Sequence, residues 1–193
     1  MKVIFLDFDG VITIPPKWYI NANKIKYIKR IVDETEAKIV VSSSWRMNTV
    51  GETIDKMIGR PKRCPRNKIL YWFIDNLYDV THTYRGLRVE EIKDYLNEHS
   101  DIENYVILDD DGDFLDEQLY HFVQTNYEDG ITEVEATRAI KILNRNFFHN
   151  SIALNFELRY QHLLNCHNLP NKYEELQKYN DLCKDIKYSY EYI

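Results

Sequence analysis

Short continuous apolar runs recur along the chain, and polar or turn-forming residues follow each of them. Runs of this length are typical of strands that are buried on both faces of a parallel sheet. They occupy residues 3–6, 38–41, 105–108 and 121–123. We expect each run to be a strand of one sheet.

The segments between these runs carry apolar residues at helical spacing. They are residues 23–32, 50–58 and 89–99, and a last segment from Thr132 to about Asn144. Thr132 and Glu135 have the spacing of a capping box, which predicts where the last helix begins. Residues 71–78 are apolar and aromatic, and their pattern fits a helix as well as a strand.

The alternation of strands and helices predicts an α/β fold, namely a Rossmann-like three-layer α/β sandwich with a mainly parallel sheet. We expect residues 1–146 to form this domain. Residues 147–193 are rich in Tyr, Asn and Leu. For these residues we expect a helical C-terminal extension that packs on the core.

Composition narrows the functional classes. The chain has 193 residues, 44% of them hydrophobic, and a formal net charge of −6, so it is globular and carries no bulk positive charge for nucleic acid. Cys64, Cys166 and Cys183 show no Cys-x-x-Cys spacing, which argues against a disulfide framework and a zinc site. No signal-peptide pattern and no apolar run of about 18 residues occur, so we expect a cytoplasmic protein that does not bind membranes.

Carboxylates gather behind two of the predicted strands. Asp7 and Asp9 follow the first run, and residues 109–113 read Asp-Asp-Asp-Gly-Asp behind the third. The carboxyl ends of parallel strands lie at one edge of the sheet, where open α/β sheets bind ligands. Carboxylates that meet there repel one another unless a cation intervenes, and hard oxygen ligands suit Mg²⁺. The alternative is a solvated polar turn behind each strand.

Hydroxyl and basic groups complete the candidate site. Ser42 and Ser43 follow the second run at a helix start, where hydroxyl and backbone N–H groups can bind phosphate oxygens. Arg85 and Arg88 precede the helix of residues 89–99, and a guanidinium there can bind phosphate through two hydrogen bonds. The alternatives are a helix N-cap for the serines and a surface position for the arginines.

The Asp-Phe-Asp-Gly-Val sequence of residues 7–11 resembles the first motif of the haloacid-dehalogenase (HAD) superfamily. Ser42 resembles the hydroxyl residue of the second motif, and Asp109-Asp110 resembles the paired acids of the fourth. The order of the motifs agrees as well, over about residues 1–143. The resemblance implies a HAD-like fold and a Mg²⁺-dependent phosphatase that hydrolyses a phosphomonoester through an aspartyl-phosphate.

The resemblance also implies a role for each carboxylate. Asp7 would be the nucleophile and a metal ligand. Asp9 would be the general acid and base, and its backbone carbonyl would bind the metal. Asp110 would complete the Mg²⁺ site, with Asp109 beside it as a further metal-site residue.

The phosphate-binding roles go to the hydroxyl and basic residues. Ser42 would hold the transferred phosphoryl group, and Ser43 is the alternative because the role depends on where the strand ends. Arg88 would neutralise the charge of the phosphate, with Arg85 as the alternative.

A narrower resemblance rests on four short sequences, at residues 42–46, 88–92, 106–111 and 130–133. Together they resemble a capless HAD branch that includes phosphatase domains of RNA-repair proteins. The gaps between the motifs are too short for a cap domain of about 50 residues, so an open site would admit a polynucleotide end. One basic cluster lies near aromatic residues, which suits single-stranded nucleic acid, although a solvated loop is the alternative. It consists of Arg60, Lys62, Arg63, Arg66 and Lys68.

Two other functions stay open. The chain could be a non-catalytic module that binds nucleic acid or protein on a HAD scaffold, because a fold alone does not determine a function. It could also be a phosphatase for small molecules such as a nucleotide or a sugar phosphate. The presence of both Asp7 and Asp9 argues against the non-catalytic module.

Overall fold

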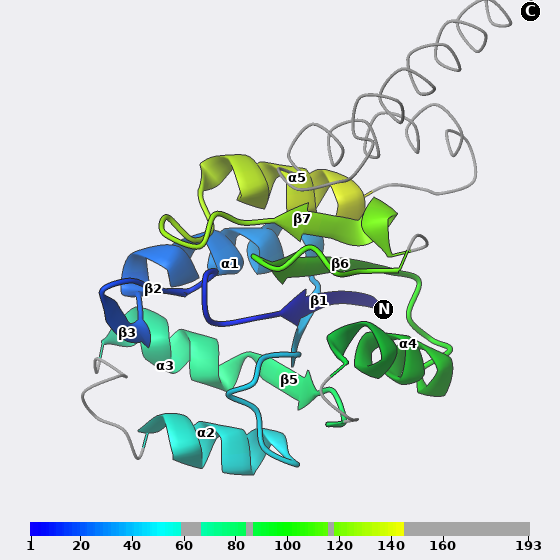
Figure 1. The fold of residues 1–193 in the computed structure, drawn as a ribbon, viewed down its shortest axis with the longest axis horizontal. Coiled ribbons are helices and arrows are strands. Elements are labelled where there is room, and N and C mark those ends of the chain that lie inside the picture. The colour runs from blue at the N-terminus through cyan, green and yellow to red at the C-terminus, as the bar shows by residue number, and fades with distance from the viewer. Residues whose placement is uncertain (59–66, 84–86, 116–117, 145–193) are drawn as a thin grey trace, which may run out of the picture. The chain divides into compact units, whose positions relative to one another are not determined.

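The computed structural model describes residues 1–58, 67–83, 87–115 and 118–144, and its centre is a parallel sheet (Figure 1). Five strands form this sheet in the order β5-β4-β1-β6-β7, and every neighbouring pair is parallel. They are β1 (Lys2–Leu6), β4 (Lys38–Val41), β5 (Leu77–Val80), β6 (Asn104–Asp109) and β7 (Phe122–Gln124). The strand order changes direction at β1, and such a switch point is where open α/β sheets form ligand sites.

Helices cover both faces of the sheet, which confirms the predicted Rossmann-like α/β sandwich. They are α1 (Ala22–Thr35), α2 (Val50–Ile58), α3 (Lys68–Asp75), α4 (Arg88–Glu98) and α5 (Glu133–Leu143). Apolar residues of α1, α2, α3 and α5 pack with Ile4 and Leu6 of β1 in one core cluster. On the other face, Ile92 and Tyr95 of α4 pack with Phe5. Successive residues of β1 therefore pack alternately against the two layers of helices.

A short antiparallel hairpin lies between β1 and α1, formed by β2 (Thr13–Ile14) and β3 (Lys17–Ile20). A 3₁₀ turn at Leu119–His121 leads into β7. No helix in the described part of the chain is both long enough and apolar enough to cross a membrane.

Most predicted elements lie within a few residues of their expected positions, because each rests on a local pattern. The capping box at Thr132 is confirmed: its side chain caps α5, and the Glu135 side chain bonds back to its backbone N–H. The ambiguous residues 71–78 contain both possible structures. They hold the end of α3 and the start of β5, with Asn76 at the junction.

Several predictions concern residues outside the described ranges. Arg85, the predicted helical extension of residues 147–193 and the basic residues 60–66 are among them. Of the basic cluster, only Lys68 is described, as the first residue of α3. The division into domains 1–146 and 147–193 therefore stays a prediction.

Candidate active site

The register of the sheet brings two carboxylates that are distant in the sequence, Asp7 and Asp109, to one side of one edge. Val3 and Phe5 point toward the α4 layer, and alternation continues this direction to Asp7, just beyond the end of β1. The backbone N–H of Asp7 still bonds to the carbonyl of Leu108, at 3.0 Å, so Asp7 stays anchored to β6. The same alternation from Ile107 directs Asp109 to this side. The convergence expected from the sequence is therefore present.

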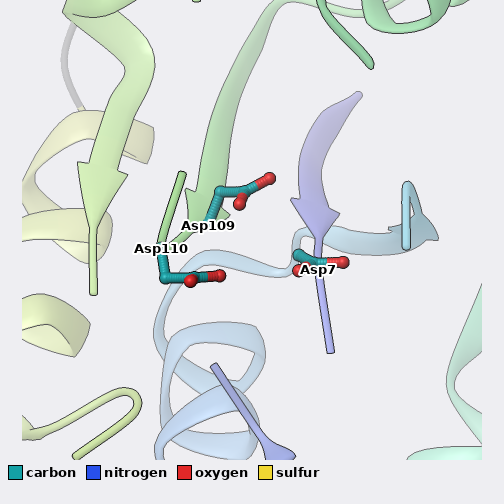
Figure 2. Close-up of side chains that lie close together, drawn as sticks. All are labelled: Asp7, Asp109 and Asp110. Atoms are coloured by element: carbon teal, nitrogen blue, oxygen red, sulfur yellow. The ribbon is translucent and has the colours of Figure 1, made fainter. Parts of the chain in front are cut away.

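Asp7, Asp109 and Asp110 form one carboxylate cluster, with an oxygen atom of each within 4.8 Å of the others (Figure 2). Asp7 is 4% exposed and Asp109 is 0% exposed. Burial, and then the Asp7 carboxylate, raise the pKa of Asp109 to about 7 and the pKa of Asp110 to about 6. Burial also raises the pKa of Asp7, against the opposing effect of Arg88. The cluster therefore holds negative charge at an energetic cost that a cation would relieve.

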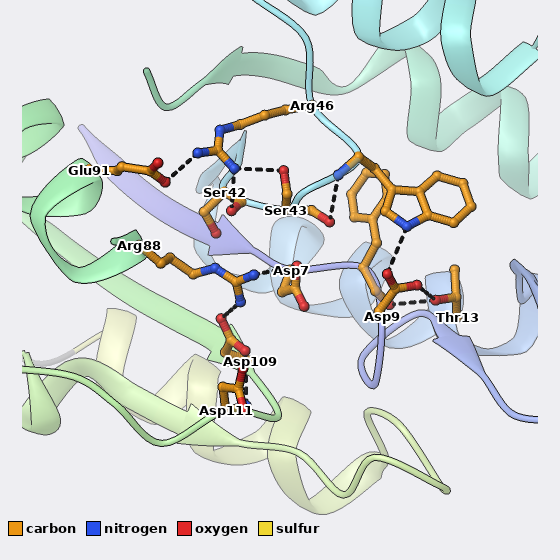
Figure 3. A network of polar contacts seen from close by, with 12 residues as sticks. Asp7, Asp9, Thr13, Ser42, Ser43, Arg46, Arg88, Glu91, Asp109 and Asp111 are labelled. Carbon is orange, nitrogen blue, oxygen red and sulfur yellow. Dashed lines mark hydrogen bonds and ion pairs between the residues drawn. The ribbon is translucent and has the colours of Figure 1, made fainter. Parts of the chain in front are cut away.

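Arg88, the first residue of α4, lies between two of these carboxylates (Figure 3). Its Nη2 is 3.3 Å from Oδ1 of Asp7, and its Nη1 donates a hydrogen bond to Oδ2 of Asp109. Burial lowers the pKa of Arg88, but the charges of Asp7 and Asp109 outweigh it and raise the pKa overall. The residue expected to bind phosphate is thus in the site, although Arg85 lies outside the described residues.

The cluster fits a divalent cation. Oδ1 of Asp109 accepts the backbone N–H of Asp111 at 3.0 Å, and its Oδ2 accepts Arg88, so both oxygens are already engaged. Asp7 and Asp110 therefore offer the oxygens that a metal would bind most readily. Among the described residues, Arg88 is the cation that pairs with the cluster, and one positive charge cannot balance three ionised carboxylates. Hard carboxylate oxygens are the ligands that Mg²⁺ prefers.

Both candidate serines lie in the site behind β4, but they make different contacts. The Ser43 hydroxyl bonds to Asp7, which lowers the pKa of that carboxyl. Its Oγ also accepts the backbone N–H of Trp45, at 3.3 Å. The Ser42 side chain is fully buried, and its hydroxyl has no hydrogen-bond partner within the described ranges. A free hydroxyl and a bonded one both suit a phosphate oxygen, so the choice between the two serines stays open.

The Asp9 side chain lies apart from the carboxylate cluster and has its own partners (Figure 3). Its Oδ2 accepts the indole N–H of Trp45 at 2.9 Å. Its Oδ1 lies 2.6 Å from the Thr13 hydroxyl, which is also 3.1 Å from the carbonyl of Phe8. Two donors thus hold the Asp9 carboxylate, and its expected role in proton transfer stays a prediction.

A buried ion pair that was not predicted lies beside the serines. Arg46 pairs with Glu91, which lies one turn after Arg88 in α4. The guanidinium also bonds to the carbonyls of Ser42 at 2.9 Å, Ser43 at 2.7 Å and Thr81 at 3.0 Å. Arg46 thus ties the serine segment and the end of β5 to the helix that carries Arg88.

Sequence patterns offered no direct signal for this pair. Both residues fall within the short sequences of the narrower resemblance, but 45 positions separate them. Periodicity describes which face of an element is buried, and it does not say which side chains meet across two elements.

Comparison with known proteins agrees with the geometry. Residues 3–136 match the family described as the HAD domain in Swiss Army Knife RNA repair proteins, which confirms the predicted resemblance. No curated protein and no solved structure matches the chain. Since the match covers more than half of the chain, the protein belongs to this family of HAD domains.

Proposed function

We propose that the protein is a Mg²⁺-dependent phosphatase that hydrolyses a phosphomonoester through a covalent intermediate on Asp7. One observation carries the proposal: the carboxylates of Asp7, Asp109 and Asp110 form one cluster, and Arg88 pairs with two of them, Asp7 and Asp109. A divalent cation would offset the negative charge that Arg88 leaves on this cluster, and a dianionic phosphate could then bind beside it. The HAD family membership supports the same chemistry.

The reaction would proceed in two displacements. A carboxylate oxygen of Asp7 attacks phosphorus, and the ester P–O bond breaks while Asp9 gives its proton to the leaving oxygen. Water then attacks phosphorus and gives a proton to Asp9, and the bond between phosphorus and Asp7 breaks. Inorganic phosphate leaves, and both aspartates return to their starting states.

The remaining residues would bind the phosphoryl group. Arg88 can turn its donors from the carboxylates to phosphate oxygens, and the Ser42 or Ser43 hydroxyl can donate another hydrogen bond. Asp7, Asp110 and the Asp9 carbonyl would hold Mg²⁺, with Asp109 beside them. When bound, the cation supplies positive charge to the phosphate oxygens.

As the substrate we propose a polynucleotide with a terminal phosphate. The family description refers to RNA repair. Residues 10–37, between β1 and β4, contain only the β2–β3 hairpin and α1, so no cap domain is inserted there. An open site admits a large substrate. The two alternatives to this proposal are a phosphatase for small phosphate esters and a module that binds without catalysis.

The chemistry is tested with Asp7→Asn, since an amide is a poor nucleophile. We expect this variant to keep the fold and lose turnover, and Asp33→Asn, on the exposed side of α1, to behave as the wild type. Brief reaction of the wild type should leave phosphate on the protein in a bond that hydroxylamine cleaves, as expected of an acyl phosphate. Turnover by Asp7→Asn equal to that of the wild type would contradict the proposal.

The substrate is tested by comparing an oligonucleotide that carries a terminal phosphate with the matching mononucleotide. We expect the oligonucleotide to have the higher kcat/KM at low salt. Its advantage should shrink as salt rises, because contacts to backbone phosphates release counterions. Equal rates on both substrates at low salt would favour a small-molecule phosphatase. Binding of the oligonucleotide without hydrolysis of either substrate would favour the non-catalytic module.

A further inference from the structure

The segment behind β4 joins the serines to the loop that carries Asp9, and Trp45 is the residue that makes this connection. Its indole N–H donates to Oδ2 of Asp9 at 2.9 Å. Its backbone N–H donates to the Ser43 hydroxyl oxygen at 3.3 Å. Trp45 therefore contacts both the expected proton-transfer group and the candidate phosphate-binding group.

The indole is itself held in place by packing. Trp45 is 8% exposed, and its ring lies 5.8 Å from the ring of Phe8, measured between centroids. Phe8 in turn packs on Phe73 of α3, at 5.9 Å. A buried aromatic ring in such a cluster has little freedom to rotate, so the direction of its N–H bond is set by the core.

Asp9 depends on its neighbours for orientation. The terminal torsion of an aspartate side chain is broad, so a carboxyl group without partners samples many orientations. Thr13 is an incomplete restraint, because its one hydroxyl hydrogen faces two acceptors, the Phe8 carbonyl and the Asp9 carboxylate. The indole N–H can only donate, and it is directed at Asp9.

We propose that Trp45 is a positioning residue that holds the Asp9 carboxyl group in the orientation needed for proton transfer to and from the substrate. The inference rests on the proposed phosphatase function, in which Asp9 protonates the leaving oxygen as the ester bond breaks. Reaction rates depend steeply on such orientation, since small misplacements of a reacting group cost large factors. A nearly buried indole is also poorly placed to stack on a nucleobase. We therefore assign the role of Trp45 to its Nε1–H group, which contacts Asp9.

The test is Trp45→Phe, which retains an aromatic ring against Phe8 and removes the N–H donor together with one ring of the indole. Leaving-group protonation matters for an alkyl phosphate and little for p-nitrophenyl phosphate, whose leaving group is already stable. Because kcat/KM reports only the steps through departure of the leaving group, we expect kcat/KM for the alkyl ester to fall roughly tenfold and kcat/KM for the aryl ester to change less than about twofold. Asp9→Asn should show the same pattern with a larger loss.

A matched control is Trp72→Phe in α3. Trp72 lies at the surface side of the core, where the Nζ of Lys29 is 4.9 Å from its ring. This variant should leave both kcat/KM values at the wild-type level. Equal losses on the two esters in Trp45→Phe, or no loss on either, would show that Trp45 has only a packing role and would overturn the inference.

A second measurement does not depend on the folding of Trp45→Phe. The chain has three tryptophans, so the indole region of a ¹H–¹⁵N spectrum is simple to assign. Asp9→Ala should move the Nε1–H resonance of Trp45 and leave that of Trp72 in place. An unmoved Trp45 resonance would overturn the inference. Wild-type protein that hydrolyses neither ester would instead overturn the proposed function, and this inference with it.

Discussion

Gly10 and Asp110 approach each other so closely that a Cβ atom on Gly10 would lie 2.5 Å from Oδ1 of Asp110. Gly10 also has a φ of +70°, a conformation that side-chain-bearing residues adopt at a cost. The turn after Asp9 thus requires glycine twice, for its backbone and for the space that the Asp110 carboxylate occupies. The second reason connects this turn directly to the proposed metal site.

Gly10→Ala should therefore weaken Mg²⁺ binding more than it weakens the fold. The new methyl group displaces the Asp110 carboxylate, and disturbing the surroundings of a ligand costs about tenfold or more in metal affinity. The measurement is the Mg²⁺ concentration that gives half-maximal activity. As a control, Gly51→Ala in α2 places its Cβ 4.0 Å from Oγ1 of Thr49, an ordinary van der Waals contact, and should stabilise the helix by about 0.5–1 kcal/mol. Unchanged Mg²⁺ dependence in Gly10→Ala would contradict the assignment of Asp110.

Arg88→Ala should remove the phosphate-binding charge of the site. We expect kcat/KM to fall roughly 100-fold, and inhibition by inorganic phosphate to weaken in parallel. Arg88→Lys should recover only part of the loss, because an ammonium cannot form two parallel hydrogen bonds. Arg30→Ala is the control, since Arg30 pairs with Glu34 and Glu133 on the surface. If inorganic phosphate inhibited Arg88→Ala as strongly as the wild type, Arg88 would not bind phosphate. Its role would then be limited to pairing with the carboxylates.

The carboxylate cluster predicts that Mg²⁺ stabilises the protein more at high pH than at low pH. In the folded protein the pKa of Asp109 is raised to about 7 and that of Asp110 to about 6, from 3.8. Protons therefore bind the folded state more tightly, and this stabilisation is present at acidic pH and is lost as pH rises through about 6 to 7. Mg²⁺ replaces those protons once both groups are ionised.

Thermal unfolding with and without Mg²⁺ measures this effect. The rise in Tm on adding Mg²⁺ should be small near about pH 5 and largest above about pH 7.5. Asp110→Asn should reduce the rise at the higher pH. Groups that titrate but do not contact the metal contribute equally to Tm with and without Mg²⁺. Their contributions therefore cancel in the difference between the two Tm values. A rise in Tm that is equal at both pH values would contradict a site built from these carboxylates.

The buried pair of Arg46 and Glu91 predicts that one double variant can regain the stability of the fold without regaining phosphate binding. Either Arg46→Met or Glu91→Leu alone leaves one buried charge unpaired and should destabilise the fold by about 3–5 kcal/mol. The double variant removes both charges and should recover much of that loss, as measured by urea unfolding. Its affinity for inorganic phosphate should nevertheless stay below that of the wild type, because the double variant loses the bonds through which Arg46 ties Ser42 and Ser43 to the helix of Arg88. If the double variant bound inorganic phosphate as tightly as the wild type, the Arg46–Glu91 pair would have a structural role only.

Much of the fold and half of the site follow from local sequence. Apolar runs of four residues specify buried strands, and a parallel sheet necessarily places their carboxyl ends at one edge. The meeting of Asp7 with Asp109 and Asp110 was therefore predictable although about a hundred positions separate the two motifs. Thr132 and Glu135 specify the start of α5 for a similar reason, since a capping box acts within one turn of helix.

Tertiary packing decided the rest. Residues 71–78 are apolar or aromatic except for Asp75 and Asn76, and the docking of α3 and β5 on the core determines that the change from helix to strand occurs at Asn76. The contact of Trp45 with Asp9 and that of Arg46 with Glu91 each join two segments that no periodicity relates. Alternation along a strand determines which face a side chain takes. Which partner it meets there depends on how neighbouring elements are placed, and the packing of the whole core sets that placement.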